Sequence, residues 1–82
     1  MREPRPYPEE AMRKYVVIYE RAEEGGWGAY VPDLPGVVAL GSTRDGVTAR
    51  IREALRAYAD ELVALGQPLP EPVAEADTIE AA

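Results

Sequence analysis

The chain contains no cysteine and no histidine among its 82 residues. No disulfide can therefore brace the fold, and the two residue types that supply most structural zinc sites are missing. A serine nucleophile would also lack its usual general base. A chain of this length has room for one small domain, and such domains often gain stability by self-association. We therefore expect no cofactor, no metal site and a homo-oligomer.

Basic residues are also scarce: nine lysines and arginines stand against fifteen acidic residues, for a formal net charge of −6. Nucleic-acid binding requires basic residues that neutralise phosphates, so direct binding of RNA or DNA is not expected. An acidic surface suits a basic protein partner, although the same charge also serves solubility. No apolar run approaches the ~20 residues of a membrane span, and residues 1–8 do not resemble a signal peptide. We expect a cytoplasmic protein.

Three apolar segments predict strands at residues 15–21, 27–31 and 36–41. The paired glycines 25–26 predict a hairpin loop between the first two. The first strand is apolar on both of its alternating faces, and one helix can cover only one of them. We therefore predict that a second copy covers the other face, in a homodimer or a dimer of dimers. The residues assigned to this self-association are Tyr15, Val17, Tyr19, Trp27 and Tyr30.

Residues 30–36 read YVPDLPG and predict two consecutive turns between the second and third strands. Pro32 sets the φ that the second position of a type I turn requires. Pro35 and Gly36 suit a type II turn, whose third position requires a positive φ.

A long amphipathic helix follows the third strand, over residues 43–65. Ser42 or Thr43 supplies its N-cap, and Gly66 and Pro68 end it. An apolar stripe at helical spacing predicts the face that packs on the sheet. The stripe consists of Val47, Ile51, Leu55, Tyr58, Leu62 and Leu65.

The order of these elements predicts an α+β fold: a three-stranded antiparallel meander with one long helix packed on one face, in the order β-β-β-α. Residues 15–72 form this domain, and residues 1–14 form a peripheral N-terminal segment. Residues 73–82 form either a fourth strand or a flexible tail.

The chain resembles the HicB-like antitoxin family in three motifs. The first is YVPDLPG at residues 30–36, the second is G-x-T at residues 41–43, and the third is the G-x-P-x-P-x-P exit from the helix at residues 66–72. The start of the helix, residues 44–47, is less acidic than is usual in the family. Many members continue into a C-terminal DNA-binding domain, whereas this sequence stops at Ala82.

The resemblance implies a partial ribonuclease-H-like fold and an antitoxin that performs no catalysis. Such an antitoxin neutralises a small basic toxin that cleaves messenger RNA, by occluding its RNA-binding or active surface. Loops on a rigid sheet commonly carry recognition, and the acidic residues on the loops here are Glu23, Glu24 and Asp33. We predict that these three face the toxin.

Two alternatives remain open. One is an orphan, self-assembling scaffold without a toxin partner. The other is a degenerate nuclease-like enzyme, which would need several carboxylates converging on metal ions. Only Glu20 and Asp33 are expected near the sheet, so we do not expect an enzyme.

Overall fold

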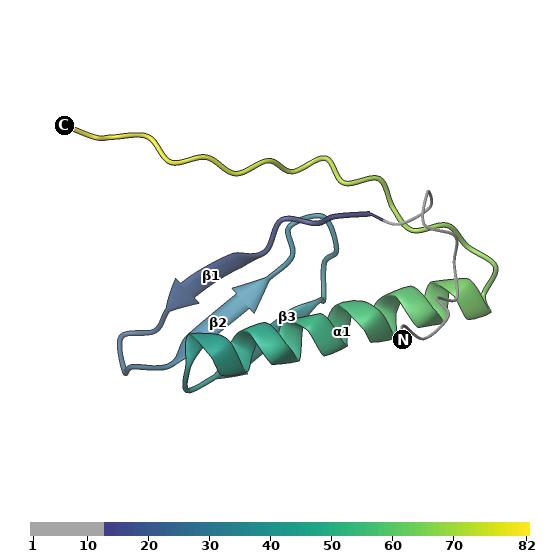
Figure 1. Ribbon diagram of the computed structural model, residues 1–82, viewed down its shortest axis with the longest axis horizontal. Coiled ribbons are helices and arrows are strands. Elements are labelled where there is room, and N and C mark those ends of the chain that lie inside the picture. Colours follow the sequence, from purple (N-terminus) through teal and green to yellow (C-terminus); the bar gives the residue numbers. More distant parts are fainter. Residues whose placement is uncertain (1–12) are drawn as a thin grey trace, which may run out of the picture.

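The computed structural model describes residues 13–82, and most of the predicted peripheral segment, residues 1–12, lies outside them. Three strands, β1 (Ile18–Arg21), β2 (Trp27–Tyr30) and β3 (Val38–Gly41), form an antiparallel sheet in the order β1-β2-β3. One helix, α1 (Arg44–Ala64), follows and packs on this sheet (Figure 1). The predicted α+β meander is confirmed, with strands shorter than the apolar segments that gave rise to them.

The loop between β2 and β3 contains both predicted turns. The Leu34 amide donates to the Val31 carbonyl at 3.0 Å, and the Val37 amide donates to the Leu34 carbonyl at 3.0 Å. Gly36 has φ +94°, as the third position of a type II turn requires. Leu34 is 1% exposed, so the double turn directs a leucine side chain into the core.

Local capping sets both ends of α1. Of the two candidate N-caps, the structure uses Thr43, whose Oγ1 accepts a hydrogen bond from the Gly46 amide at 3.0 Å. At the other end, Gly66 has φ +71° and the Gln67 amide donates to the Leu62 carbonyl at 2.9 Å. These features define a Schellman motif, in which glycine adopts the left-handed conformation without strain.

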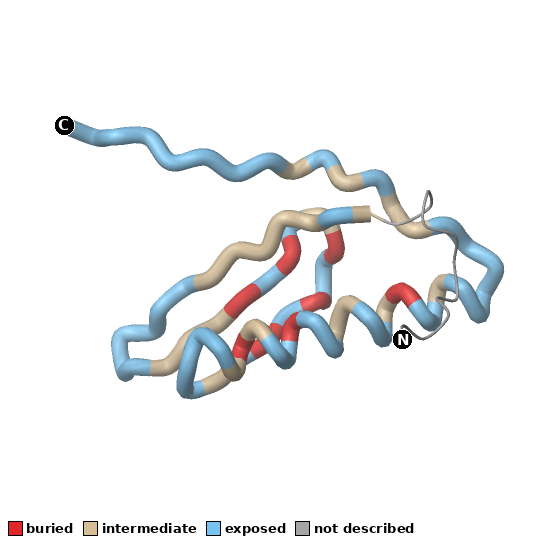
Figure 2. The backbone as a smooth tube through the Cα atoms, in the orientation of Figure 1, coloured by how far each residue is buried: buried red, intermediate tan, exposed pale blue. Residues whose placement is uncertain are grey.

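The core lies between α1 and one face of the sheet. Figure 2 shows buried segments on the strands, on the loop after β2 and on α1, where Ala59 of the second half of the helix is also buried. The buried cluster consists of Ala29, Val31, Leu34, Val37, Ala39, Val47 and Ile51. The predicted stripe weakens toward the end of the helix: Leu55 and Tyr58 are partly buried, and Leu65 is 63% exposed. The last turn of α1, after Ala59, therefore contributes little to the core.

After α1 the chain is extended and belongs to no helix or strand. Figure 1 shows it turning back from the end of the helix and running past the sheet to the C-terminus. Of the two options for residues 73–82, a fourth strand is thus not formed within the described chain.

Candidate protein-interaction surface

The face of the sheet under α1 contains four of the five residues predicted to mediate self-association. Tyr15, Val17, Tyr19 and Trp27 are partly buried against the core cluster. Tyr15, Val17 and Tyr19 share one face, as predicted. That face lies under α1, whereas the prediction placed it on the exposed side of the sheet. Within one chain these large side chains are thus packed against the core, and their part in self-association stays a prediction.

Tyr19 is held against α1 by contacts with two residues of that helix. Its hydroxyl lies 2.8 Å from Thr48 Oγ1, and Thr48 Oγ1 also donates to the Arg44 carbonyl at 3.0 Å. The Arg44 guanidinium lies 4.1 Å from the centroid of the Tyr19 ring. Hydrogen bonding and a cation–π contact thus fix this ring to the first turns of α1.

The opposite side of the sheet, here called the outer face, is covered by no described helix or strand. The strand register places two rows of residues there: Ile18, Tyr30 and Val38 in one, and Glu20, Gly28 and Leu40 in the other. Tyr30 is 39% exposed, Val38 60% and Leu40 74%. Tyr30 is the predicted self-association residue that does lie on this face. Contiguous exposed apolar side chains are typical of interaction surfaces.

A shallow hollow of about 360 Å³ lies along β3. It is lined by Val38, Ala39 and Leu40 of β3 and by Arg50 of α1. Arg50 is exposed and forms no ion pair with another residue of the described chain. The hollow therefore combines hydrocarbon side chains with one available cation, which suits binding rather than chemistry.

Sequence reasoning missed Val38, Leu40 and Arg50. A signal for the first two was present in residues 37–40, which are four consecutive apolar residues. Because side chains alternate along a strand, such a run makes both faces of the strand apolar. Arg50 has no comparable signal, because its position beside β3 depends on how α1 crosses the sheet.

The three acidic residues predicted to face a partner do not form one surface. Glu23 and Glu24 are exposed in the turn between β1 and β2. Asp33 lies in the β2–β3 loop at the opposite end of the sheet. Its carboxylate accepts hydrogen bonds from the Val73 amide at 3.1 Å and from the Ala74 amide at 3.1 and 3.2 Å. Asp33 thus has an intramolecular role.

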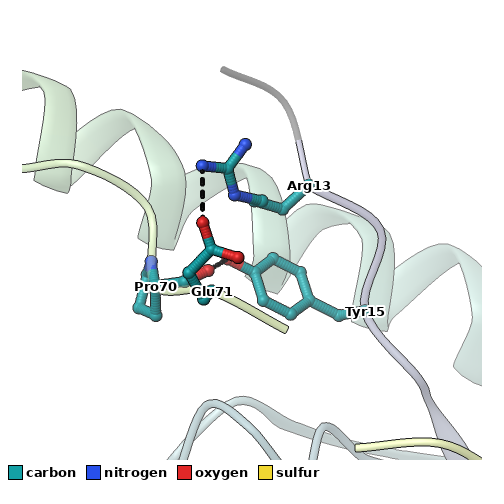
Figure 3. A network of polar contacts seen from close by, with 4 residues as sticks. All are labelled: Arg13, Tyr15, Pro70 and Glu71. Carbon is teal, nitrogen blue, oxygen red and sulfur yellow. Dashed lines mark hydrogen bonds and ion pairs between the residues drawn. The ribbon is translucent and has the colours of Figure 1, made fainter. Parts of the chain in front are cut away.

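Asp33 belongs to a set of contacts, here called the clamp, that holds residues 70–74. The Tyr15 hydroxyl donates to the Pro70 carbonyl at 2.6 Å, and Arg13 pairs with Glu71 at 3.1 Å (Figure 3). Burial raises the pKa of the Tyr15 hydroxyl above its ordinary value of 10.0, although the neighbouring Arg13 charge opposes this shift.

The described residues contain no group of three or more histidine, cysteine or acidic residues placed to hold a metal ion. The two carboxylates expected near the sheet are separated: Glu20 lies in β1, and Asp33 lies in the loop after β2. Within residues 13–82, no helix has both the length and the apolar character needed to cross a membrane.

Comparison with known proteins identifies relatives along most of the chain. Residues 15–82 match the family described as HicB_like antitoxin of bacterial toxin-antitoxin system. A UPF0150 protein of Thermoplasma acidophilum is 37% identical over 68 residues, which cover 83% of this chain and 99% of that protein. A UPF0150 protein of Synechocystis is 35% identical over 57 residues, 70% of this chain and 72% of the relative.

Among solved structures, the chain is similar to the N-terminal domain of the Burkholderia pseudomallei antitoxin HicB. The two share 27% sequence identity and a TM-score of 0.65, over 72% of this chain and 69% of the other. Sequence and fold therefore point to the same family. The chain belongs to the HicB-like antitoxin family.

Proposed function

We propose that this protein is a non-catalytic antitoxin that binds a small, basic, mRNA-cleaving toxin and occludes its RNA-binding or active surface. The match to the HicB-like antitoxin family over residues 15–82 carries the proposal, because it spans the whole α+β unit. The likeness to the N-terminal domain of the Burkholderia pseudomallei antitoxin HicB supports it independently through the fold.

The charge of the chain supports a basic partner. The formal net charge is −6, and opposite potentials accelerate and orient protein association. Glu23 and Glu24 are exposed in a tight turn and are our candidates for direct contact with the toxin. Asp33 acts indirectly in this proposal, by holding the backbone of residues 73 and 74.

Inhibition by occlusion requires a stable surface and no reacting group. The apolar outer face, with Tyr30, Val38 and Leu40 exposed, supports a homodimer or a dimer of dimers as the active form.

A toxin that cleaves messenger RNA acts in the cytoplasm, so we place the antitoxin there too.

The test begins with a search beside this gene for a reading frame that encodes a small basic protein. Such a protein is then assayed for cleavage of messenger RNA with and without this chain. We expect stoichiometric inhibition. The chain alone should neither cleave RNA with magnesium or manganese nor shift DNA in a low-salt mobility assay. Metal-dependent cleavage by the chain alone, or full toxin activity in its presence, would overturn the proposal.

Charge-reversed variants test whether the β1–β2 turn contacts the toxin. Glu23→Lys with Glu24→Lys should weaken inhibition, because two attractive charges become repulsive. Glu53→Lys with Glu61→Lys, on the exposed side of α1, changes the net charge equally and is the matched control; it should inhibit like the unchanged protein. Equal inhibition by both variants would exclude the β1–β2 turn from the interface.

An orphan, self-assembling scaffold is the second candidate function. The uncovered outer face favours this function, because that face could mediate self-association whether or not a toxin exists. An oligomer that inhibits no neighbouring toxin, and that recovers no basic protein from its native extract, would support this alternative.

A further inference from the structure

The last eight described residues, 75–82, form an extended arm that makes no contact with the body through hydrogen bonds or ion pairs. All eight are exposed, and Ile79 is 89% exposed. The Thr78 amide donates to the neighbouring Asp77 carboxylate at 2.8 Å, and the described part of the chain offers the arm's other amides no partner. An extended backbone with open donors and acceptors is suited to pairing with a sheet edge.

The base of this arm has a fixed position. The Ala74 amide donates to Asp33, and the Pro70 carbonyl accepts from Tyr15. The arm therefore leaves the body at a defined point, and only the residues beyond the clamp are free to reach another surface. At about 3.3 Å per extended residue, eight residues are long enough to lie along a four-residue strand.

Of the two edge strands, β3 is the less protected. β1 carries the charges of Glu20 and Arg21, which discourage pairing at a sheet edge. β3 has the sequence VALG, with no charge and no proline. The hollow of about 360 Å³ also lies along β3 and not along β1.

The backbone of β3 presents hydrogen-bonding groups at this edge. The Val31 amide donates to the Val37 carbonyl at 3.2 Å. Val37, and with it Ala39 and Gly41, therefore directs its amide and carbonyl toward β2. In an antiparallel pair, every second residue directs its amide and carbonyl away from the partner strand. Val38 and Leu40 are the residues that direct theirs toward the open edge.

The arm also complements the hollow in charge. It carries Glu75, Asp77 and Glu80 and no basic residue. Because successive side chains of an extended segment point to opposite sides, each side of the arm bears a carboxylate. A paired arm therefore brings a carboxylate toward Arg50, whose guanidinium has no ion-pair partner within residues 13–82.

We propose that the arm of one copy adds as a fourth strand to β3 of a second copy, so that two chains exchange arms in a closed homodimer. The clamp lies at Tyr15, on the β1 side of the chain, whereas β3 is the opposite edge of the sheet. Figure 1 shows the arm leading away from β3 of its own chain. A reciprocal exchange uses both arms and both β3 edges, as a two-fold interface requires. The inference specifies the self-association in the proposed function and is independent of any toxin.

Removal of residues 75–82 tests the exchange directly. Sedimentation at micromolar concentration should show the unchanged chain at twice its 9.0 kDa mass and the truncated chain as a folded monomer by circular dichroism. A monomeric unchanged chain would overturn both the self-association and the arm exchange. A truncated chain that still forms the dimer would overturn the arm exchange alone.

A pair of matched leucine variants tests the acceptor strand. Leu40→Glu on β3 should raise the dimer Kd by about tenfold or more, because the new carboxylate would repel the acidic arm. Leu65→Glu is the control, since Leu65 is 63% exposed against 74% for Leu40 and lies beyond the helix. Equal Kd values for the two variants would exclude β3 as the acceptor.

The absence of cysteine allows a direct test of proximity. Leu40→Cys protein is mixed with Thr78→Cys or Ala76→Cys protein under mild oxidation, and mixed disulfides are identified by peptide mass spectrometry. We expect an arm–β3 disulfide from at least one pair, well above the yield with Glu53→Cys on α1. Yields no greater than that control would contradict the proposal.

Discussion

At Gly36 the backbone has φ +94°, although no atom lies within 4 Å of the position that a Cβ would take. Backbone strain rather than crowding therefore opposes any side chain there. We expect Gly36→Val to lower the free energy of unfolding by about 1–3 kcal/mol, since β-branched residues rarely adopt this conformation. Urea denaturation measures the loss. Gly36→Asn, which tolerates positive φ better, should lose less, and an unchanged midpoint for Gly36→Val would refute the turn assignment.

Tyr15 gives the clamp a dependence on pH. Its pKa in the folded chain lies above the ordinary value of 10.0, because burial disfavours the phenolate. The neutral hydroxyl is also the donor to Pro70. The contribution of Tyr15 to stability is therefore complete below pH 10 and is lost as the pH rises through the higher folded pKa.

We expect the free energy of unfolding to fall more steeply above about pH 10 for the unchanged chain than for Tyr15→Phe. The two proteins differ only in this hydroxyl, so the difference between the two curves isolates Tyr15. Parallel curves would show that this hydroxyl does not couple the clamp to pH.

At the scale of the elements, the N-terminus of α1 offers adjacent hydroxyl residues with different roles. Thr43 Oγ1 accepts from the Gly46 amide at 3.0 Å, whereas Ser42 makes no capping bond. We expect Thr43→Ala to lower the free energy of unfolding by about 0.5–2 kcal/mol, and Ser42→Ala to have a much smaller effect. Thermal denaturation of the two variants is the comparison, and equal losses would contradict the assigned cap.

The ends of the elements could be predicted because each depends on a few neighbouring residues. The double turn rests on Pro32 and Gly36, and the helix stop rests on Gly66. Which face of β1 meets the helix could not be predicted in this way. Both faces are apolar, so local pattern gave no preference, and packing of the tyrosine-rich face against α1 decided between them.

At the scale of the whole molecule, the clamp was not predictable from the sequence. Asp33 and Ala74 are 41 positions apart, and Arg13 and Glu71 are 58 positions apart. No periodicity or turn signal extends over such separations. Residues 70–72 were expected only as part of a family-like helix exit, and residues 73 and 74 only as the start of a fourth strand or a flexible tail. The candidate role of Asp33 in a partner interface did not include this contact.

Coupling of folding to association should make thermal stability depend on concentration. For an arm-exchanged dimer, we expect Tm to rise by about 3–5 °C for each tenfold increase in protein concentration. Scanning calorimetry or circular dichroism over a hundredfold range measures the slope. The chain without residues 75–82 should show no slope, and a flat response of the unchanged chain would count against a dimer linked to folding.

The order of the sheet, β1-β2-β3, has a consequence for kinetics. Every strand pairs with its neighbour in the chain, and the helix that covers them follows at once. Such sequential contacts require little loop closure and favour rapid folding. The sheet and α1 can fold before residues 70–74 are bound by the clamp. Exchange of the arms, in contrast, requires an encounter between two molecules. A newly made chain should therefore pass through a folded, single-chain stage, and dilution should lengthen that stage without slowing the first step.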